Sequence, residues 1–241
     1  MNGRYKDSSA PHKEVSHIQF GILSAEEIEE NSVVEVVHTE LFERNLPKPG
    51  GLYDLRMGTI DKKILCQTCN CDVIDCQGHY GFIKLVEPVY NVCYIKTVLK
   101  VLNCVCVRCS KYLGTPTILQ KKKASVVFRQ AIDACKKIQT CDACVFTQPK
   151  ITLDAWNIYF VFDGVKRVLT PVRAFNILRK ISKEDCYKLG LNSRFAHPMN
   201  MIIRNLIVPP PVVRPSVVMD TNSRTQDDLT QKLLEILKTN I

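Results

Sequence analysis

The stretch CQTCNCDVIDCQGH at residues 66–79 contains four cysteines and a histidine, and three of these cysteines form the spacing C-x2-C-x6-C-x2-H with the histidine. Structural zinc is bound by four thiolate or imidazole ligands arranged as a tetrahedron. A gap of two residues allows both side chains of a pair to turn back onto one ion. We therefore predict a zinc site whose ligands are Cys66, Cys69, Cys76 and His79.

A second set of cysteines follows with the same short spacing. Cys106 and Cys109 form one C-x2-C pair, and Cys141 and Cys144 form another after a gap of 31 residues. We predict that these four thiolates bind a second zinc ion. Since each set fills all four tetrahedral positions with protein ligands, no position is left for water, and both ions are predicted to be structural rather than catalytic.

The other cysteines leave alternatives open. Cys104 and Cys135 could each replace a neighbour in the second site, and Cys71 is an additional thiol beside the first. Cys93 and Cys186 are interpreted as ordinary buried thiols. A disulfide scaffold is disfavoured, because disulfide-dense chains are mostly small and secreted and residues 1–10 have no apolar core of a signal peptide. We therefore expect a reducing intracellular compartment.

Composition allows one large domain or two small ones, since 46% of the 241 residues are hydrophobic. No run of 18 apolar residues is present, so no transmembrane helix and no membrane partner are expected. The formal charge of +9 would fall to about +6 with seven thiolates and two Zn²⁺ ions bound. A basic chain is compatible with a nucleic-acid partner, although the lysines at 121–123 and 136–137 fit a solvated helix face equally well.

Motifs of common enzymes are absent from the sequence. It contains no phosphate-binding loop, no glycine-rich dinucleotide fingerprint and no Gly-x-Ser-x-Gly elbow. Asp227 and Asp228 are interpreted as a helix start rather than a magnesium site, and His197 as a structural loop residue. The sequence therefore offers no catalytic residue.

The predicted fold class is α+β, an irregular zinc-stapled core with short strands and several helices. We expect a disordered tail at residues 1–14, a region with the first zinc site at 15–104, and a region with the second site at 105–205. Residues 206–241 contain a proline-rich segment, a loop and an amphipathic helix.

Local signals predict the individual elements. Ser24 and Glu27 form a capping box for a short helix, while Val33–Val37 and Tyr80–Val86 are predicted strands. Helices are expected at 90–103 and 121–138, and strands at 151–169 with a turn at Asp163-Gly164.

Further helix signals lie in the C-terminal half. Thr170-Pro171 should start a helix that runs to about Ile181, and Ser182 another that stops at Gly190. Residues 212–225 have little periodicity and are predicted to be an exposed loop. The last helix, starting at Asp227-Asp228, should bury one side formed by Leu229, Leu233, Ile236 and Leu237.

Several blocks of sequence carry a family resemblance. They are GGLYDLRMG at 50–58, CQTC at 66–69, CQGHYG at 76–81, VCVRC at 105–109, CVFTQP at 144–149, PPP at 209–211, VRPS at 213–216 and DDLT at 227–230. In this order they resemble the N-terminal region of the largest subunit of multisubunit DNA-directed RNA polymerases, in the RNA polymerase II style. The resemblance covers residues 15–241, and a short segment before the last blocks points to a viral or otherwise diverged member.

The resemblance implies a role for each part. Residues 15–104 correspond to the clamp core and 105–205 to the clamp head, which two structural Zn²⁺ ions stiffen. The loop from Val213 to Asp228 resembles the lid, which helps to peel RNA from the template. Arg214 and Arg224 are the candidates for contact with nucleic-acid phosphates.

The resemblance also implies partners. They are the DNA template, the RNA–DNA hybrid, the second-largest subunit, other polymerase subunits and the remainder of the largest subunit. The family's magnesium-binding aspartates lie beyond Ile241, so the chain belongs to a nucleotidyltransferase without containing its catalytic residues. The expected location is the nucleus or, for a virus, a cytoplasmic factory or virion. The alternative function is a free-standing zinc-binding module for nucleic acid or protein; an enzyme with catalytic zinc is disfavoured by the closed ligand sets.

Overall fold

The computed structural model describes residues 14–44, 46–115, 123–220 and 223–240. It confirms the mixed class, with helices and small antiparallel sheets around the two cysteine clusters. Nearly all of the predicted disordered tail lies outside the described residues. None of the helices in the described ranges has the length and apolar character to cross a membrane.

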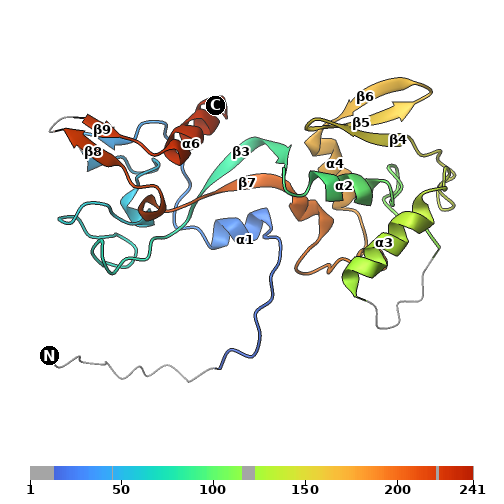
Figure 1. Cartoon of the computed structure of the whole chain (residues 1–241), viewed down its shortest axis with the longest axis horizontal. Coiled ribbons are helices and arrows are strands. Elements are labelled where there is room, and N and C mark those ends of the chain that lie inside the picture. Colours follow the sequence, from blue (N-terminus) through green and yellow to red (C-terminus); the bar gives the residue numbers. More distant parts are fainter. Residues whose placement is uncertain (1–13, 45, 116–122, 221–222, 241) are drawn as a thin grey trace.

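Two lobes lie at opposite ends of a two-stranded ribbon (Figure 1). The ribbon pairs β3 (Gly81–Tyr90) with β7 (Ile202–Val208) in antiparallel register. The first lobe surrounds an apolar cluster that includes Leu52, Met57 and Val208. The second lobe surrounds another cluster, which consists mainly of residues between 95 and 202. The two clusters have no residue in common.

The first lobe is built from short elements. They are β1 (Phe42–Glu43), β2 (Leu46–Pro47) and the 3₁₀ helix η1 (Leu55–Met57). The predicted strand at Val33–Val37 is wrong in extent, because only Glu35 forms a bridge, a parallel one to Phe82. Val34 and Val36 are nevertheless buried, so the β-branched pattern reflects packing against the ribbon rather than a full strand.

The helix α1 (Ala25–Glu30) lies against the ribbon, and the predicted capping box at its start is confirmed. The Glu27 amide donates to Ser24 Oγ at 3.1 Å, and the Ser24 amide donates to the Glu27 carboxylate at 2.8 Å. This reciprocal pair satisfies two of the four N–H groups that a helix start leaves open.

The second lobe contains α2 (Ile95–Leu102), α3 (Ala124–Cys135) and a three-stranded sheet formed by β4 (Lys150–Asp154), β5 (Asn157–Phe162) and β6 (Val165–Leu169). The predicted turn at Asp163-Gly164 is confirmed, with positive φ at both residues, as a tight two-residue hairpin requires. α2 begins later than expected, because β3 continues to Tyr90.

The remainder of the second lobe follows the cap signals. Thr170 caps α4 (Pro171–Leu178), which ends earlier than the predicted Ile181, and Ser182 caps α5 (Lys183–Lys188). The chain leaves α5 through Gly190, whose φ is +70°, a conformation that glycine adopts without strain. The 3₁₀ helix η2 (Pro198–Met201) then leads into β7.

The C-terminal segment returns to the first lobe through η3 (Pro211–Val213). The predicted exposed loop at 212–225 is wrong, because β8 (Val217–Asp220) and β9 (Ser223–Thr225) pair as a hairpin. α6 (Asp228–Thr239) is capped by Asp227 as predicted. The buried side of α6 differs from the prediction at one position, because Leu229 is 52% exposed and Thr230 is buried instead. Thr230 accepts a hydrogen bond from the buried Arg214.

Candidate metal centres

The first candidate metal centre lies in the first lobe. The ligand atoms of Cys66, Cys69, Cys76 and His79 all lie within 4.8 Å of one another. Cys76 Sγ lies 3.8 Å from His79 Nε2. Zinc–sulfur and zinc–nitrogen bonds of about 2.3 and 2.0 Å place tetrahedral ligands about 3.5–3.8 Å apart. The donor set and its spacing therefore fit one zinc ion.

The second candidate centre joins two distant pairs in the second lobe. Cys106 Sγ lies 3.5 Å from Cys144 Sγ, and Cys109 Sγ lies 3.7 Å from Cys141 Sγ. All four sulfur atoms lie within 4.8 Å of one another. The edge of a zinc–thiolate tetrahedron is about 3.8 Å, whereas a disulfide has a bond of about 2.05 Å. This geometry fits a metal centre and not a pair of disulfides.

All three C-x2-C pairs adopt the same backbone turn. The amide of the first cysteine donates to the carbonyl five residues later in each case: Cys66 to Cys71 at 3.0 Å, Cys106 to Lys111 at 2.9 Å and Cys141 to Phe146 at 3.0 Å. The amide of the residue four positions after the first cysteine donates back to that cysteine's carbonyl. These residues, Asn70, Ser110 and Val145, have φ values of +55°, +61° and +52°.

The turn also aims N–H groups at sulfur. The amides of Thr68 and Arg108 each lie 3.4 Å from the first thiol of their pair, Cys66 and Cys106. Such donors stabilise the negative charge of a thiolate ligand. The short sequence spacing thus produces both the ligand geometry and part of its electrostatic support.

Gln148 supports the second centre, and no pattern in the sequence assigned it this role. Its Nε2 donates to Cys106 Sγ at 3.2 Å and to the Phe146 carbonyl at 2.8 Å, while its Oε1 accepts from the Val107 amide at 3.0 Å. One side chain therefore ties the two halves of the site together, as the outer residues of metal sites commonly do.

The thiols differ in acidity. The hydrogen bond with His79 lowers the pKa of Cys69 to about 6, whereas burial raises the pKa of Cys76 to about 11. In the second centre burial acts to raise the pKa of Cys106, but the amides of Cys109 and Arg108 outweigh it and lower this pKa to about 7. Thiolates this close repel one another, so a divalent cation is the fitting counter-charge for the complete sets.

The remaining thiols lie outside both centres. Cys104 and Cys135 are buried, and Cys135 Sγ lies 3.7 Å from the Cys104 carbonyl rather than in the second cluster. Cys71 Sγ lies 3.4 Å from the Cys69 carbonyl. Cys186 is buried as predicted, but Cys93 is exposed, so that interpretation is wrong for Cys93.

Arg214 is fully buried, which contradicts its assignment as a residue that meets nucleic-acid phosphates. Its guanidinium donates to the Pro209 carbonyl at 2.9 Å, to Thr230 Oγ1 at 3.2 Å and to the Leu52 carbonyl. It also stacks 5.3 Å above the Tyr53 ring. Burial lowers its pKa to about 10. Arg214 therefore joins three distant segments inside the first lobe.

The other singled-out polar residues are placed as follows. The backbone of Arg224 lies in β9, and its side chain is outside the described part of the chain, so its phosphate contact stays a prediction. His197 is half-buried, burial lowers its pKa, and its Nδ1 accepts from the Met199 amide at 3.2 Å. Its contacts are those of a structural residue.

Comparison with known proteins gives concordant matches. The family model described as RNA polymerase Rpb1, domain 1, matches residues 12–241. DNA-directed RNA polymerase II subunit RPB1 of Euplotoides octocarinatus is 35% identical over 262 residues, covering 98% of this chain and 55% of that protein. DNA-directed RNA polymerase subunit Rpo1N of Methanocaldococcus jannaschii is 35% identical over 242 residues, covering 95% and 18%. The chain thus spans about half of one relative and under a fifth of the other.

Proposed function

Because this chain belongs to the RNA polymerase Rpb1 domain 1 family, we propose that it is the clamp portion of the largest subunit of a DNA-directed RNA polymerase. In this role it holds template DNA and the RNA–DNA hybrid during transcription. The observation that carries the proposal is the pair of closed four-ligand clusters, one in each lobe, within a chain that matches the family over nearly its whole length.

Zinc is proposed to stiffen both lobes. The ligands are Cys66, Cys69, Cys76 and His79 in the first lobe, and Cys106, Cys109, Cys141 and Cys144 in the second. When bound, the ions supply cross-links between segments that have few regular elements of their own. The chain's own residues fix the ligand orientation through the three turns and Gln148, so that each lobe can act as a rigid body.

The four-part division is retained as part of the proposal, with a tail at 1–14, a clamp core at 15–104, a clamp head at 105–205 and a lid-bearing segment at 206–241. The β8–β9 hairpin is then the lid. The chain contributes to nucleotidyl transfer by position, and Mg²⁺ belongs to a part of the enzyme outside these residues. The remainder of the largest subunit, the second-largest subunit and further subunits complete the enzyme.

Contact with nucleic acid is proposed at the base of the hairpin. Lys62 and Lys63 are exposed and line a groove of ≈ 690 Å³ together with Pro215 and Ser216. Lysines that neutralise phosphates give affinity without reading bases, and this affinity falls as salt rises. Because Arg214 is buried, these two lysines replace it as candidates for contact with nucleic-acid phosphates. Arg224 remains a candidate for the same contact.

The groove is tested in the assembled enzyme by K62A/K63A, with K166A in the β4–β6 sheet as the matched control. We expect the K62A/K63A enzyme to leave its DNA template sooner, with a smaller dependence of the dissociation rate on salt, and the control to match wild type. Equal salt dependence in all three enzymes would exclude the groove as a phosphate contact.

The function as a whole is tested by purifying the tagged protein from its native source and identifying by mass spectrometry what accompanies it. A second-largest polymerase subunit, together with a chain that carries the magnesium-binding aspartates, is the expected result. Recovery of the protein without any polymerase subunit would overturn the proposal and leave the free-standing zinc module as the better reading.

A further inference from the structure

The ribbon that runs between the lobes is interrupted at its middle. Lys84 pairs with Asn205 and Val89 pairs with Ile203, so residues 85–88 of β3 lie opposite Arg204 alone. Pro88 within this bulge has no N–H to donate. A bulge breaks the hydrogen-bond ladder and bends the strand. The two strands therefore have a natural bending point between the two apolar clusters.

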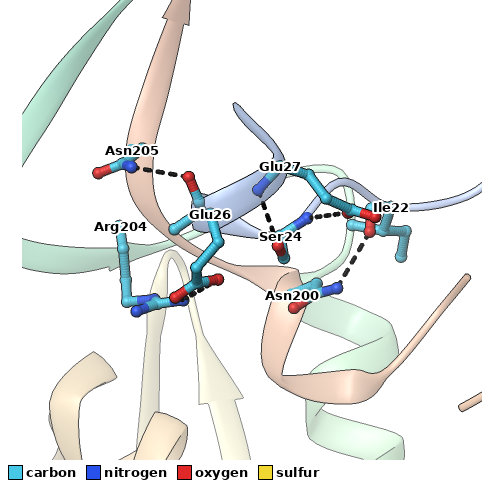
Figure 2. A network of polar contacts seen from close by, with 8 residues as sticks. Ile22, Ser24, Glu26, Glu27, Asn200, Arg204 and Asn205 are labelled. Atoms are coloured by element: carbon cyan, nitrogen blue, oxygen red, sulfur yellow. Dashed lines mark hydrogen bonds and ion pairs between the residues drawn. The ribbon is translucent and has the colours of Figure 1, made fainter. Parts of the chain in front are cut away.

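Helix α1 holds the strand that faces this bulge (Figure 2). Arg204 Nη2 donates to both carboxylate oxygens of Glu26, at 2.7 and 2.9 Å. The next residue, Asn205, donates from Nδ2 to the Ala25 carbonyl at 2.8 Å. Within η2, just before β7, Asn200 Nδ2 donates to the Ile22 carbonyl at 3.1 Å.

The bulged strand β3 is held by the C-terminal end of α6. Asn240, the C-cap of α6, accepts from the Val86 amide at 2.9 Å and donates to the Lys84 carbonyl at 2.8 Å. One amide side chain thus satisfies an N–H and a carbonyl that the interrupted ladder leaves open. The bulge on β3 is consequently tied to the first lobe through α6.

The second lobe also reaches the bending point. The Arg204 guanidinium lies 4.8 Å from the centre of the Phe175 ring, which belongs to α4. Arg204 therefore contacts α1 through an ion pair and the second lobe through its flat face. This residue links α1 and the second lobe at the position opposite the bulge.

The grip of α1 is polar rather than apolar. None of the six residues of α1 is buried, and the Glu26 and Arg204 side chains are 62% and 31% exposed. Water competes directly for contacts of this kind, so each stabilises only weakly. A helix that is held by side-chain hydrogen bonds and a partly exposed ion pair, and whose apolar Ile28 is only half-buried, can leave the ribbon without exposing a fully buried residue of its own.

From these contacts we propose that α1 is a releasable clasp over a hinge in the β3–β7 ribbon. While it is closed, the Glu26–Arg204 ion pair and the Asn205 hydrogen bond fix the angle between the lobes. When it opens, β7 bends at residues 203–205 against the bulge at 85–88, and the second lobe turns relative to the first. The clasp and the hinge consist only of residues of this chain, so this proposal does not rest on which partner the protein binds.

The clasp is tested by measuring the distance between the lobes in the zinc-loaded full chain. Spin labels are attached through the non-canonical amino acid p-acetylphenylalanine at Ile74 and Trp156, which are 84% and 64% exposed and lie in different lobes. Cysteine labelling is avoided because of the zinc ligands. Double electron–electron resonance then gives the distance distribution for wild type and variants.

Substitution E26Q should broaden this distribution and displace its mean, because the ratio of open to closed clasp rises about two- to fivefold, as expected for a partly exposed ion pair. The matched control is D154N, which removes the 2.7 Å ion pair to Lys166 within one sheet and should leave the distribution unchanged.

Two results would overturn the proposal: an E26Q distribution identical to wild type, or an equal change in the D154N distribution. A thermal melt of each variant confirms that the lobes remain folded, since Glu26 and Asp154 are both largely exposed.

Discussion

Replacement of Arg214 by methionine should destabilise the first lobe strongly. Methionine keeps the unbranched apolar stem of the side chain but removes every donor. The carbonyls of Leu52 and Pro209 and the hydroxyl of Thr230 would each lose a hydrogen-bond donor in the interior. A buried acceptor left unsatisfied costs about 1–3 kcal/mol.

These three losses are partly offset. The hydrogen bonds of Arg214 go to neutral oxygens, so its charge is buried at a cost that methionine relieves. We therefore expect a net loss of about 3 kcal/mol in the free energy of unfolding, at the lower end of the roughly 3–9 kcal/mol that three unsatisfied acceptors would cost. With a urea dependence of about 3 kcal/mol per molar, the midpoint should fall by about 1 M.

The assay is urea unfolding with zinc present, followed by circular dichroism and by fluorescence of Trp156. Trp156 is the chain's one tryptophan and lies at the β4–β5 turn of the second lobe. The urea midpoint of R214M should therefore fall when unfolding is followed by circular dichroism. It should stay unchanged when unfolding is followed by the fluorescence of Trp156, which reports on the second lobe. The matched control is R194M, which removes an exposed guanidinium 5.1 Å from the Phe195 ring and should change stability by less than about 0.5 kcal/mol.

The outcome that refutes the reasoning is an R214M midpoint equal to that of R194M. It would mean that water or backbone movement satisfies the three acceptors without the guanidinium. R214K gives a further check, because a lysine ammonium lacks the planar donors that serve several acceptors at once. R214K should recover part of the loss but not all of it.

Three more predictions follow from the described contacts. C106S should leave one zinc ion per chain instead of two, measured by mass spectrometry of the metal, and should lower the melting temperature of the second lobe; two ions at full affinity would contradict the ligand assignment. V145G should stabilise the second lobe by about 1 kcal/mol in urea unfolding, because Val145 has a φ of +52° and is exposed; a destabilised variant would show that the turn does not strain valine. Burial acts to raise the pKa of Asp54, but its hydrogen bonds with Arg56 and with the amide of Gly50 outweigh this and lower it. Its contribution to stability should thus be present above about pH 4 and lost as the pH falls through the lowered pKa, so D54N should show a flatter acid unfolding curve than wild type, and parallel curves would refute this role.

The sequence alone determined the features that depend on near neighbours. The spacing of Cys66 and Cys69 dictates a turn that brings both sulfur atoms to one point, whatever surrounds it. The caps at Ser24 and Thr170 likewise need only residues within one helical turn. Positive φ at Asp163-Gly164 follows from a two-residue hairpin loop.

The tertiary structure decided which side chains are buried and which segments meet. An arginine in a proline-rich segment is expected to be exposed, and Arg214 became internal only because Leu52 and Thr230 from distant parts of the chain supplied acceptors. Residues 217–220 and 223–225 became paired strands, although no periodicity in this segment predicts such pairing. Glu26 and Arg204, 178 positions apart, meet because the fold lays α1 on β7. Burial and long-range pairing depend on the free energy of the whole packed arrangement, which the pattern of any short segment does not contain.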